Sequence, residues 1–142
     1  MAIVLDTNIV RPVLAGTQPA ASILAPLLEA YNASDGLLVC APVYAELLAG
    51  PGATIAVLDE FLAATGMTID HTFPFIVWQD AGLAYQAYAR RRSAAGQQLP
   101  RRILADFIIG AYALRHATAL MTLNRDDFMR IFPSLPLIVP NV

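Results

Sequence analysis

Four acidic residues occur where a solvated charge is not expected, inside or soon after apolar segments: Asp6, Glu46, Asp106 and Asp127. Acidic side chains are rarely buried unless something compensates their charge. Converging carboxylates repel one another, and hard oxygen ligands of this kind select Mg²⁺ or Mn²⁺. A divalent ion that also binds phosphate oxygens is suited to hydrolysing a phosphodiester bond. The four acids therefore predict a metal-dependent site that cleaves phosphodiesters.

The residues that follow Asp106 predict a tightly packed helix face around it. Positions four and seven residues further along a helix lie on the same face, and here they are Gly110 and Ala113. Small side chains at these positions permit another element to approach closely. An acid on such a narrow seam is poorly solvated, so Asp106 is more informative than an acid on an open surface.

Apolar runs and turn signals predict the elements that must position these acids. Five strands are expected, at 2–5, 37–40, 67–70, 119–122 and 137–139. Five helices are expected, at 19–31, 42–49, 54–64, 75–95 and 102–115. The side chains of 6–8 can cap a further helix start, and 32–36 and 124–127 are expected to be turns. This alternation is typical of an α/β sandwich with a mainly parallel sheet, in a single domain over residues 1–142.

The expected topology brings the acids toward one edge of the sheet. Ligands of parallel α/β sheets bind beyond the carboxyl ends of the strands. Asp6 and the turn at 124–127 both follow strands, whereas Glu46 and Asp106 lie on helices that can project into the same crevice. The sequence thus predicts one shared acidic site.

Composition excludes several classes of protein. The chain has 142 residues, of which 57% are hydrophobic and only 14% charged, so a disordered chain is excluded. The longest segment without an ionised side chain, 12–28, is broken by prolines, so no membrane span is expected. The single cysteine, Cys40, excludes an intramolecular disulfide and fits a reducing, cytoplasmic setting. The formal net charge is −2, and all nine basic residues are Arg.

Four motifs along the chain resemble those of PIN domains, in particular the ribonuclease toxins of VapBC-type toxin–antitoxin pairs. They are IVLDTN at 3–8, YAEL at 44–47, ADFIIGAYAL at 105–114 and MTLNRDDF at 121–128. No single motif is specific, but four in this order span almost the whole chain. The resemblance implies a three-layer α/β/α fold with a central sheet of four to five strands. It also implies a metal-dependent endoribonuclease that a cognate antitoxin inhibits.

The resemblance also implies roles for individual residues. Asp6 and Asp106 would be the principal ligands of Mg²⁺ or Mn²⁺, and Glu46 would bind the metal through water or help to deprotonate the attacking water. Asp127 would complete the catalytic set, although Asp126 competes for that role. The first turn position is Asn124, where many family members have Asp.

Supporting roles fall to polar residues that orient the acids or bind phosphate through hydrogen bonds. By the same resemblance these are Thr7, Asn8, Thr122 and Asn124.

Five of the nine arginines flank the segment 93–100: Arg90, Arg91, Arg92, Arg101 and Arg102. The resemblance makes RNA backbone a plausible partner for them, because arginine contacts to phosphate supply most non-specific affinity for nucleic acid. A solvated helix end is the alternative explanation. The apolar segments 20–31 and 51–64 are expected to form an antitoxin groove, a homodimer face or ordinary core.

Two other functions remain open from the sequence. One is a PIN-like module that binds RNA or protein without cleaving it. The other is a phosphatase that uses Asp6 as an aspartyl nucleophile. Such phosphatases need a second acid two residues later, where this chain has Asn8, and a lysine, which this chain lacks.

Overall fold

The computed structural model describes residues 2–98 and 104–142, and within them five strands form one parallel sheet. The strands are β1 (Ile3–Leu5), β2 (Leu37–Val39), β3 (Thr68–Ile69), β4 (Ala119–Met121) and β5 (Leu137–Ile138). Their order across the sheet is β3-β2-β1-β4-β5, so β1 lies in the middle. Ile3 pairs with Leu37 on one side and with Ala119 on the other. This central position explains why β1 is apolar and buried along its whole length.

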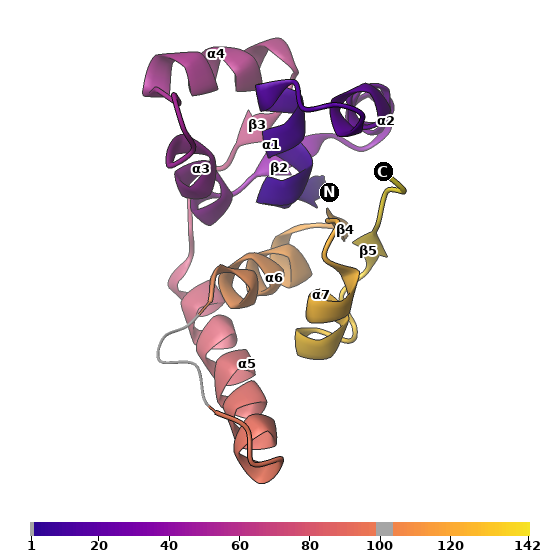
Figure 1. Cartoon of the computed structure of the whole chain (residues 1–142). Helices are drawn as coiled ribbons and strands as arrows, with labels where there is room; N and C mark the ends of the chain where they lie inside the picture. The colour runs from indigo at the N-terminus through magenta and orange to yellow at the C-terminus, as the bar shows by residue number, and fades with distance from the viewer. Residues whose placement is uncertain (1, 99–103) are drawn as a thin grey trace.

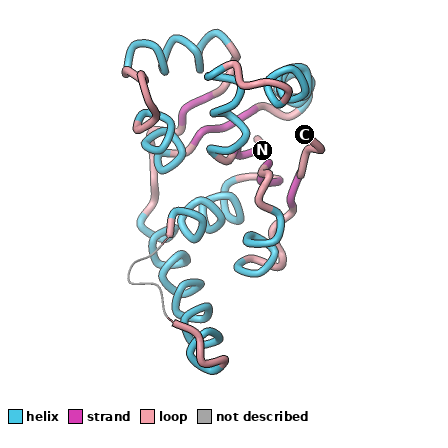
Figure 2. The backbone as a smooth tube through the Cα atoms, in the orientation of Figure 1, coloured by secondary structure: helices cyan, strands magenta, loops and turns pink. Residues whose placement is uncertain are grey.

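The described residues also form seven helices. They are α1 (Thr7–Ala15), α2 (Ala20–Ser34), α3 (Ala41–Leu48), α4 (Ile55–Ala64), α5 (Phe75–Ala94), α6 (Ala105–His116) and α7 (Arg125–Ile131). The strands are two or three residues long, and Figure 2 shows them in magenta among the cyan helices. None of the helices in the described ranges is both long and apolar enough to cross a membrane.

The connections sort the helices into two layers. The chain moves from β1 to β2 to β3 in one direction across the sheet, and then returns past β1 to β4 and β5. Right-handed crossovers therefore place α1–α4 on one face and α5–α7 on the other. Figure 1 shows the first group in the upper half of the view and the second in the lower half. The predicted three-layer α/β/α sandwich is confirmed, and its sheet is entirely parallel.

Helix α6 is the most deeply buried of the described helices. Phe107, Tyr112 and Ala113 are fully buried, as is Phe128 of α7. A Cβ atom on Gly110 would lie 2.4 Å from the ring of Phe132, so glycine is what allows α6 and the end of α7 to touch. The predicted close approach at Gly110 is confirmed.

The expectation of a turn at 124–127 is wrong in part, because α7 begins at Arg125. Asp126 and Asp127 occupy its first turn, where negative charge is favourable, and Phe128 and Phe132 bury its apolar side. The expected turn at 32–36 is also shorter, since α2 continues to Ser34. The predicted helix start at 102 lies outside the described residues.

Candidate active site

Asp6 lies at the junction of β1 and α1. It is only 5% exposed, and it is the N-cap residue of α1. Its Oδ1 accepts a hydrogen bond from the amide of Thr7 at 2.8 Å, and its Oδ2 accepts one from the Thr122 hydroxyl at 2.7 Å. The cap therefore fixes the carboxylate at the carboxyl end of the central strand.

Thr122 connects the ends of β1 and β4. It is fully buried, and its Oγ1 accepts hydrogen bonds from Asn8 Nδ2 at 3.4 Å and from the Asn124 amide at 3.0 Å. Asn8 in turn accepts a hydrogen bond from the amide of Leu123 at 3.1 Å. These bonds hold the start of α1 against the segment after β4, so the predicted supporting residues lie together around Asp6.

Glu46 reaches the same region from α3. Its Oε1 accepts a hydrogen bond from the Thr7 hydroxyl at 2.7 Å. Arg11 donates from Nη2 to the main-chain carbonyl of Glu46 at 2.6 Å. Thr7 thus links Asp6 and Glu46, because its amide binds one carboxylate and its hydroxyl binds the other.

Asp127 is held in the first turn of α7. Asn124 Nδ2 donates to its Oδ2 at 2.9 Å, and Arg130 Nη1 lies 3.6 Å from its Oδ1. Asn124, the departure from the family's usual Asp, therefore acts here as a hydrogen-bond donor that an aspartate would not supply at neutral pH. The neighbouring Asp126 is exposed.

Asp106 shows that the four acids form one electrostatic unit. It lies in the first turn of α6 and is partly buried. Burial raises the pKa of its carboxyl to about 6, with further contributions from the negative charges of Asp6, Asp127 and Glu46, in that order. Burial, with a smaller contribution from the charge of Glu46, also raises the pKa of Asp6. The charge contributions to the shift of Asp106 include Asp127 and not Asp126.

The donor set of this cluster fits a hydrated divalent ion. Within the ranges that the structure describes, Asp6, Glu46 and Asp106 have no ion-pair partner, and of the four acids only Asp127 pairs with an arginine side chain, that of Arg130. No three acidic, histidine or cysteine side chains of those ranges are arranged as a ready metal site. Mg²⁺ keeps several of its waters and needs only one or two carboxylates. Hard oxygen donors with uncompensated negative charge therefore fit such an ion.

Comparison with known proteins identifies the family of this chain. The family model described as PIN domain matches residues 3–131. The chain belongs to the PIN domain family. PIN domains are generally nucleases and typically depend on a divalent metal ion. No curated protein sequence matches this PIN domain.

Two solved structures share the fold of this PIN domain. One is a chain in the crystal structure of VapBC2 from Rickettsia felis bound to a DNA fragment from their promoter. It has a TM-score of 0.67 and 22% identity, over 99% of this chain and 100% of that one. The other is a chain of VapBC-1 from nontypeable Haemophilus influenzae, with a TM-score of 0.62 and 22% identity, over 98% of both chains.

The predicted arginines of this PIN domain have different surroundings. Arg91 and Arg92 line a hollow between α5 and α7 together with Arg130, whereas Arg90 does not line it. Arg101 and Arg102, which were also predicted to contact the RNA backbone, lie outside the described residues. Sequence reasoning missed Arg11 and Arg130. Arg130 lies three residues after Asp127, and on a helix this spacing brings two side chains together. The pair was not predicted because 124–127 was expected to be a turn rather than the start of a helix.

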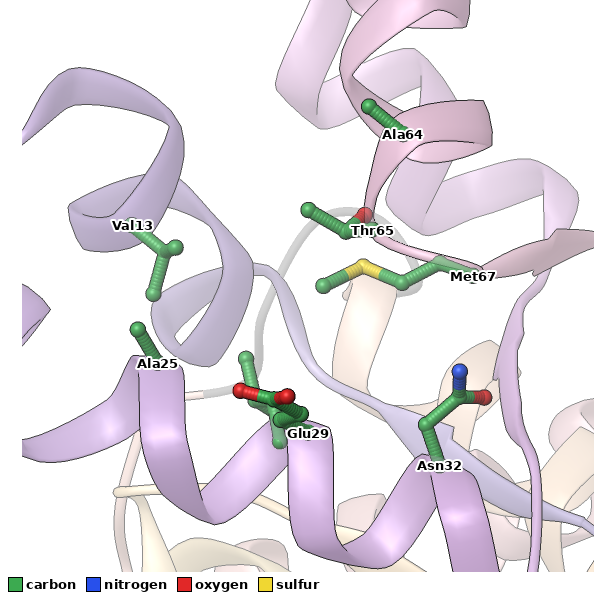
Figure 3. A pocket seen from close by; sticks show the side chains of 8 residues that line it. Val13, Ala25, Glu29, Asn32, Ala64, Thr65 and Met67 are labelled. Carbon is green, nitrogen blue, oxygen red and sulfur yellow. The ribbon is translucent and has the colours of Figure 1, made fainter.

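Two partly apolar hollows of this PIN domain lie away from the acids. Figure 3 shows a pocket of about 400 Å³ in which Glu29 and Asn32 of α2 face Thr65 and Met67, which follow α4. A second hollow of about 390 Å³ lies between α1, the end of α3 and α4, and none of the four acids lines either hollow. The apolar segments 20–31 and 51–64 thus supply surface as well as core.

Proposed function

We propose that this PIN domain is a Mg²⁺- or Mn²⁺-dependent endoribonuclease and the toxin of a toxin–antitoxin pair. The observation that carries the proposal is that hydrogen bonds from Thr7 and Thr122 hold Asp6 and Glu46 together beyond the central strand. The raised pKa of Asp106 supports it, since three other carboxylates from different elements contribute to the shift. Carboxylates that disfavour one another's charged forms fit a site that binds a cation. Membership of a family of metal-dependent nucleases supports the same conclusion.

Asp6 and Asp106 are the proposed metal ligands. Both lie at the carboxyl end of the sheet, and both have raised pKa values that a cation would lower. The bound ion would make a water more acidic and stabilise the negative charge that develops on phosphate oxygens. The hydrogen bonds from the amide of Thr7 and from Thr122 hold Asp6 in one orientation, so that it is ready to bind the ion.

Glu46 and Asp127 are proposed to complete the catalytic set from opposite sides. Glu46 is oriented by the Thr7 hydroxyl, which donates to Oε1, and its other oxygen, Oε2, is proposed to accept a proton from the attacking water. Asp127 is oriented by Asn124 and adds negative charge near Asp106. The substrate is proposed to be single-stranded or looped RNA, because proteins read the unstacked bases of such segments.

A protein antitoxin is the proposed partner. Both similar structures carry VapBC names, and this chain presents apolar hollows together with exposed Ile55 and Val57 on α4. A homodimer is proposed through α5, where Trp78 and Leu83 are exposed. An RNA substrate and a single reduced cysteine fit a cytoplasmic location.

Incubation with a transfer-RNA pool tests the proposal. The protein is expected to cut RNA when Mn²⁺ or Mg²⁺ is present and to stop when the chelator EDTA is added. Calorimetric titration of the same protein with Mn²⁺ separates a nuclease from a silent binding module. Absence of both metal binding and cleavage would contradict the proposal and favour the module.

A further inference from the structure

The hollow between α5 and α7 collects three guanidinium groups. It measures about 300 Å³ and is lined by Tyr88, Arg91, Arg92, Gln97 and Arg130. Arg91 and Arg92 come from the last turns of α5, whereas Arg130 comes from α7. The hollow is therefore formed by two elements that are far apart in the sequence.

The positive charge of this hollow is largely uncompensated. Arg91 donates to the carbonyl of Arg130 at 3.5 Å, and Arg92 donates to the carbonyl of Gln98 at 2.9 Å and to the hydroxyl of Tyr88 at 3.1 Å. All these acceptors are neutral. In the part of the chain that the structure describes, the only acid paired with any of the three arginines is Asp127, at 3.6 Å from Arg130. Three arginines and one aspartate leave a net positive charge that an anionic ligand can neutralise.

The guanidinium groups are oriented by their surroundings. The guanidinium carbon of Arg92 lies 5.5 Å from the ring centroid of Tyr88, within the range of a cation–π contact. The ring of Tyr88 packs edge-on against Phe107, with centroids 5.4 Å apart. A planar guanidinium held in this way binds phosphate with more geometric specificity than a free side chain does.

The hollow adjoins the acidic site at Arg130, and a second link runs through α6. Phe107, which supports Tyr88, directly follows Asp106 in α6. Arg130 lies one helical turn from Asp127 on α7. A nucleic-acid strand that lies across the acids can therefore pass Arg130, which lines the hollow and lies 3.6 Å from Asp127.

We propose that this hollow is a phosphate subsite that binds the RNA backbone next to the bond that is cut. The inference rests on the proposed function, because it assumes that RNA lies across the acids. The C-terminal dipole of α5 favours Arg91 and Arg92 at this end, but it does not bring Arg130 from α7 to the same hollow. Three guanidinium groups beside an aromatic ring fit a phosphodiester, because guanidinium groups match phosphate oxygens in two-pronged contacts. An acidic peptide is the competing ligand, which the test below distinguishes.

The test measures RNA affinity without cleavage. A fluorescent 12-nucleotide RNA is titrated with the full chain in EDTA at several salt concentrations. The double variant Arg91→Gln/Arg130→Gln is expected to bind about tenfold more weakly. The slope of log affinity against log salt is expected to fall by about 0.7 for each phosphate that the variant no longer neutralises. Arg115→Gln is the control, because Arg115 is an exposed arginine on α6 that pairs with Asp80 and does not line the hollow. Its affinity is expected to stay within about twofold of the original chain.

The outcomes separate this inference from the proposed function. Equal losses of affinity in the double variant and in Arg115→Gln would indicate a diffuse basic surface and overturn the subsite. Displacement of RNA by a poly-glutamate peptide in the original chain but not in the double variant would assign the hollow to an acidic peptide and also overturn it. Cleavage that is unaffected in the double variant, together with unchanged affinity, would leave the nuclease standing and remove the subsite. A chain that never cleaves RNA but binds it more weakly in the double variant would keep the subsite and remove the nuclease.

Discussion

Thr122 is the residue that fixes the geometry of the acidic site. It is fully buried, it donates to Asp6, and it accepts from Asn8 and from the Asn124 amide. A side chain with one hydroxyl is thereby used in three hydrogen bonds that join two strand ends. The site depends on this arrangement because Asp6 is only 5% exposed and Thr122 supplies one of the two hydrogen bonds that hold its carboxylate.

Replacing Thr122 by valine is expected to impair both stability and catalysis. Valine keeps the shape but removes the hydroxyl, which leaves Asp6 without one donor and raises the pKa of its carboxyl further. Loss of a buried donor of this kind costs about 1–3 kcal/mol. Urea unfolding is expected to report this loss, and RNA cleavage is expected to fall at least tenfold. Thr122→Ser restores the hydroxyl and is expected to recover most of the cleavage. A valine variant with unchanged cleavage would contradict the role given to Thr122.

The raised pKa of Asp106 predicts how the stability of the metal-free protein depends on pH. The folded pKa is about 6 and the ordinary value is 3.8, so the folded state binds more protons than the unfolded state between these values. The free energy of unfolding therefore falls as pH rises from about 4 to 6 and stays lower above that. Asp106→Asn removes this penalty and is expected to stabilise the metal-free protein at pH 7 by about 1–3 kcal/mol.

Thermal unfolding in EDTA at pH 4 and pH 7 checks this expectation. The difference in Tm between the variant and the original chain is expected to be small at pH 4 and clear at pH 7. Asp126→Asn is a suitable control, because Asp126 is exposed and does not affect Asp106. An Asp106→Asn variant that is less stable than the original chain at pH 7 would contradict the penalty assigned to its charge.

At the scale of elements, the contact between α6 and α7 decides where Asp106 and Asp127 lie. Gly110 faces Phe132 so closely that a Cβ atom would lie 2.4 Å from the ring, and Phe132 is itself buried. Asp106 lies one turn before Gly110 on the same helix, and Asp127 lies on the helix that leads to Phe132. A change at this contact therefore moves two acids relative to each other.

Gly110→Ala is expected to destabilise the protein and weaken cleavage. Overpacking of a buried contact costs about 1–3 kcal/mol, and it outweighs the gain of about 1 kcal/mol from replacing glycine in a helix. Gly82→Ala is the matched control in α5, because no atom lies within 4 Å of the added Cβ. That variant is expected to gain up to about 1 kcal/mol. Equal effects of the two substitutions in chemical unfolding would contradict the close contact.

Much of this arrangement was predictable from the sequence, and the exceptions have physical reasons. The strands were predictable because buried parallel strands are continuous apolar runs, as at Ile3–Leu5. Helix α7 was not, because its first turn is polar and resembles a loop, and its stability comes from the burial of Phe128 and Phe132. The acids were recognisable by their apolar neighbours. The donor role of Asn124 and the salt bridge of Arg130 were not, since both depend on the helical geometry of α7.

At the scale of the whole molecule, the modest net charge of −2 conceals a separation of charge. Four acids gather at the carboxyl end of the sheet, and three arginines gather beside them between α5 and α7. A cation bound by the acids would offset their negative charge, and a nucleic-acid backbone bound by the arginines would offset their positive charge. The low charged fraction of 14% makes this separation a large part of the charge on the molecule.

Metal binding is expected to stabilise the whole fold. An ion that binds only the folded state raises the free energy of unfolding by about 2.7 kcal/mol at a concentration of 100 times its Kd. Millimolar Mn²⁺ at pH 7 is therefore expected to raise Tm by several degrees, and EDTA is expected to reverse the shift. Asp6→Asn is expected to lose most of the shift. An equal shift in that variant would assign the metal to another part of the surface.

Cleavage by single-acid variants tests the central claim, that the converging acids form a nuclease site, most directly. Initial rates are measured on a transfer-RNA pool with Mn²⁺ for the original chain, Asp6→Asn, Asp106→Asn and Asp126→Asn, each shown by circular dichroism to be folded. The first two variants are expected to lose at least about a hundredfold in rate, whereas Asp126→Asn is expected to stay within about threefold. Undiminished cleavage by folded Asp6→Asn or Asp106→Asn would contradict the claim.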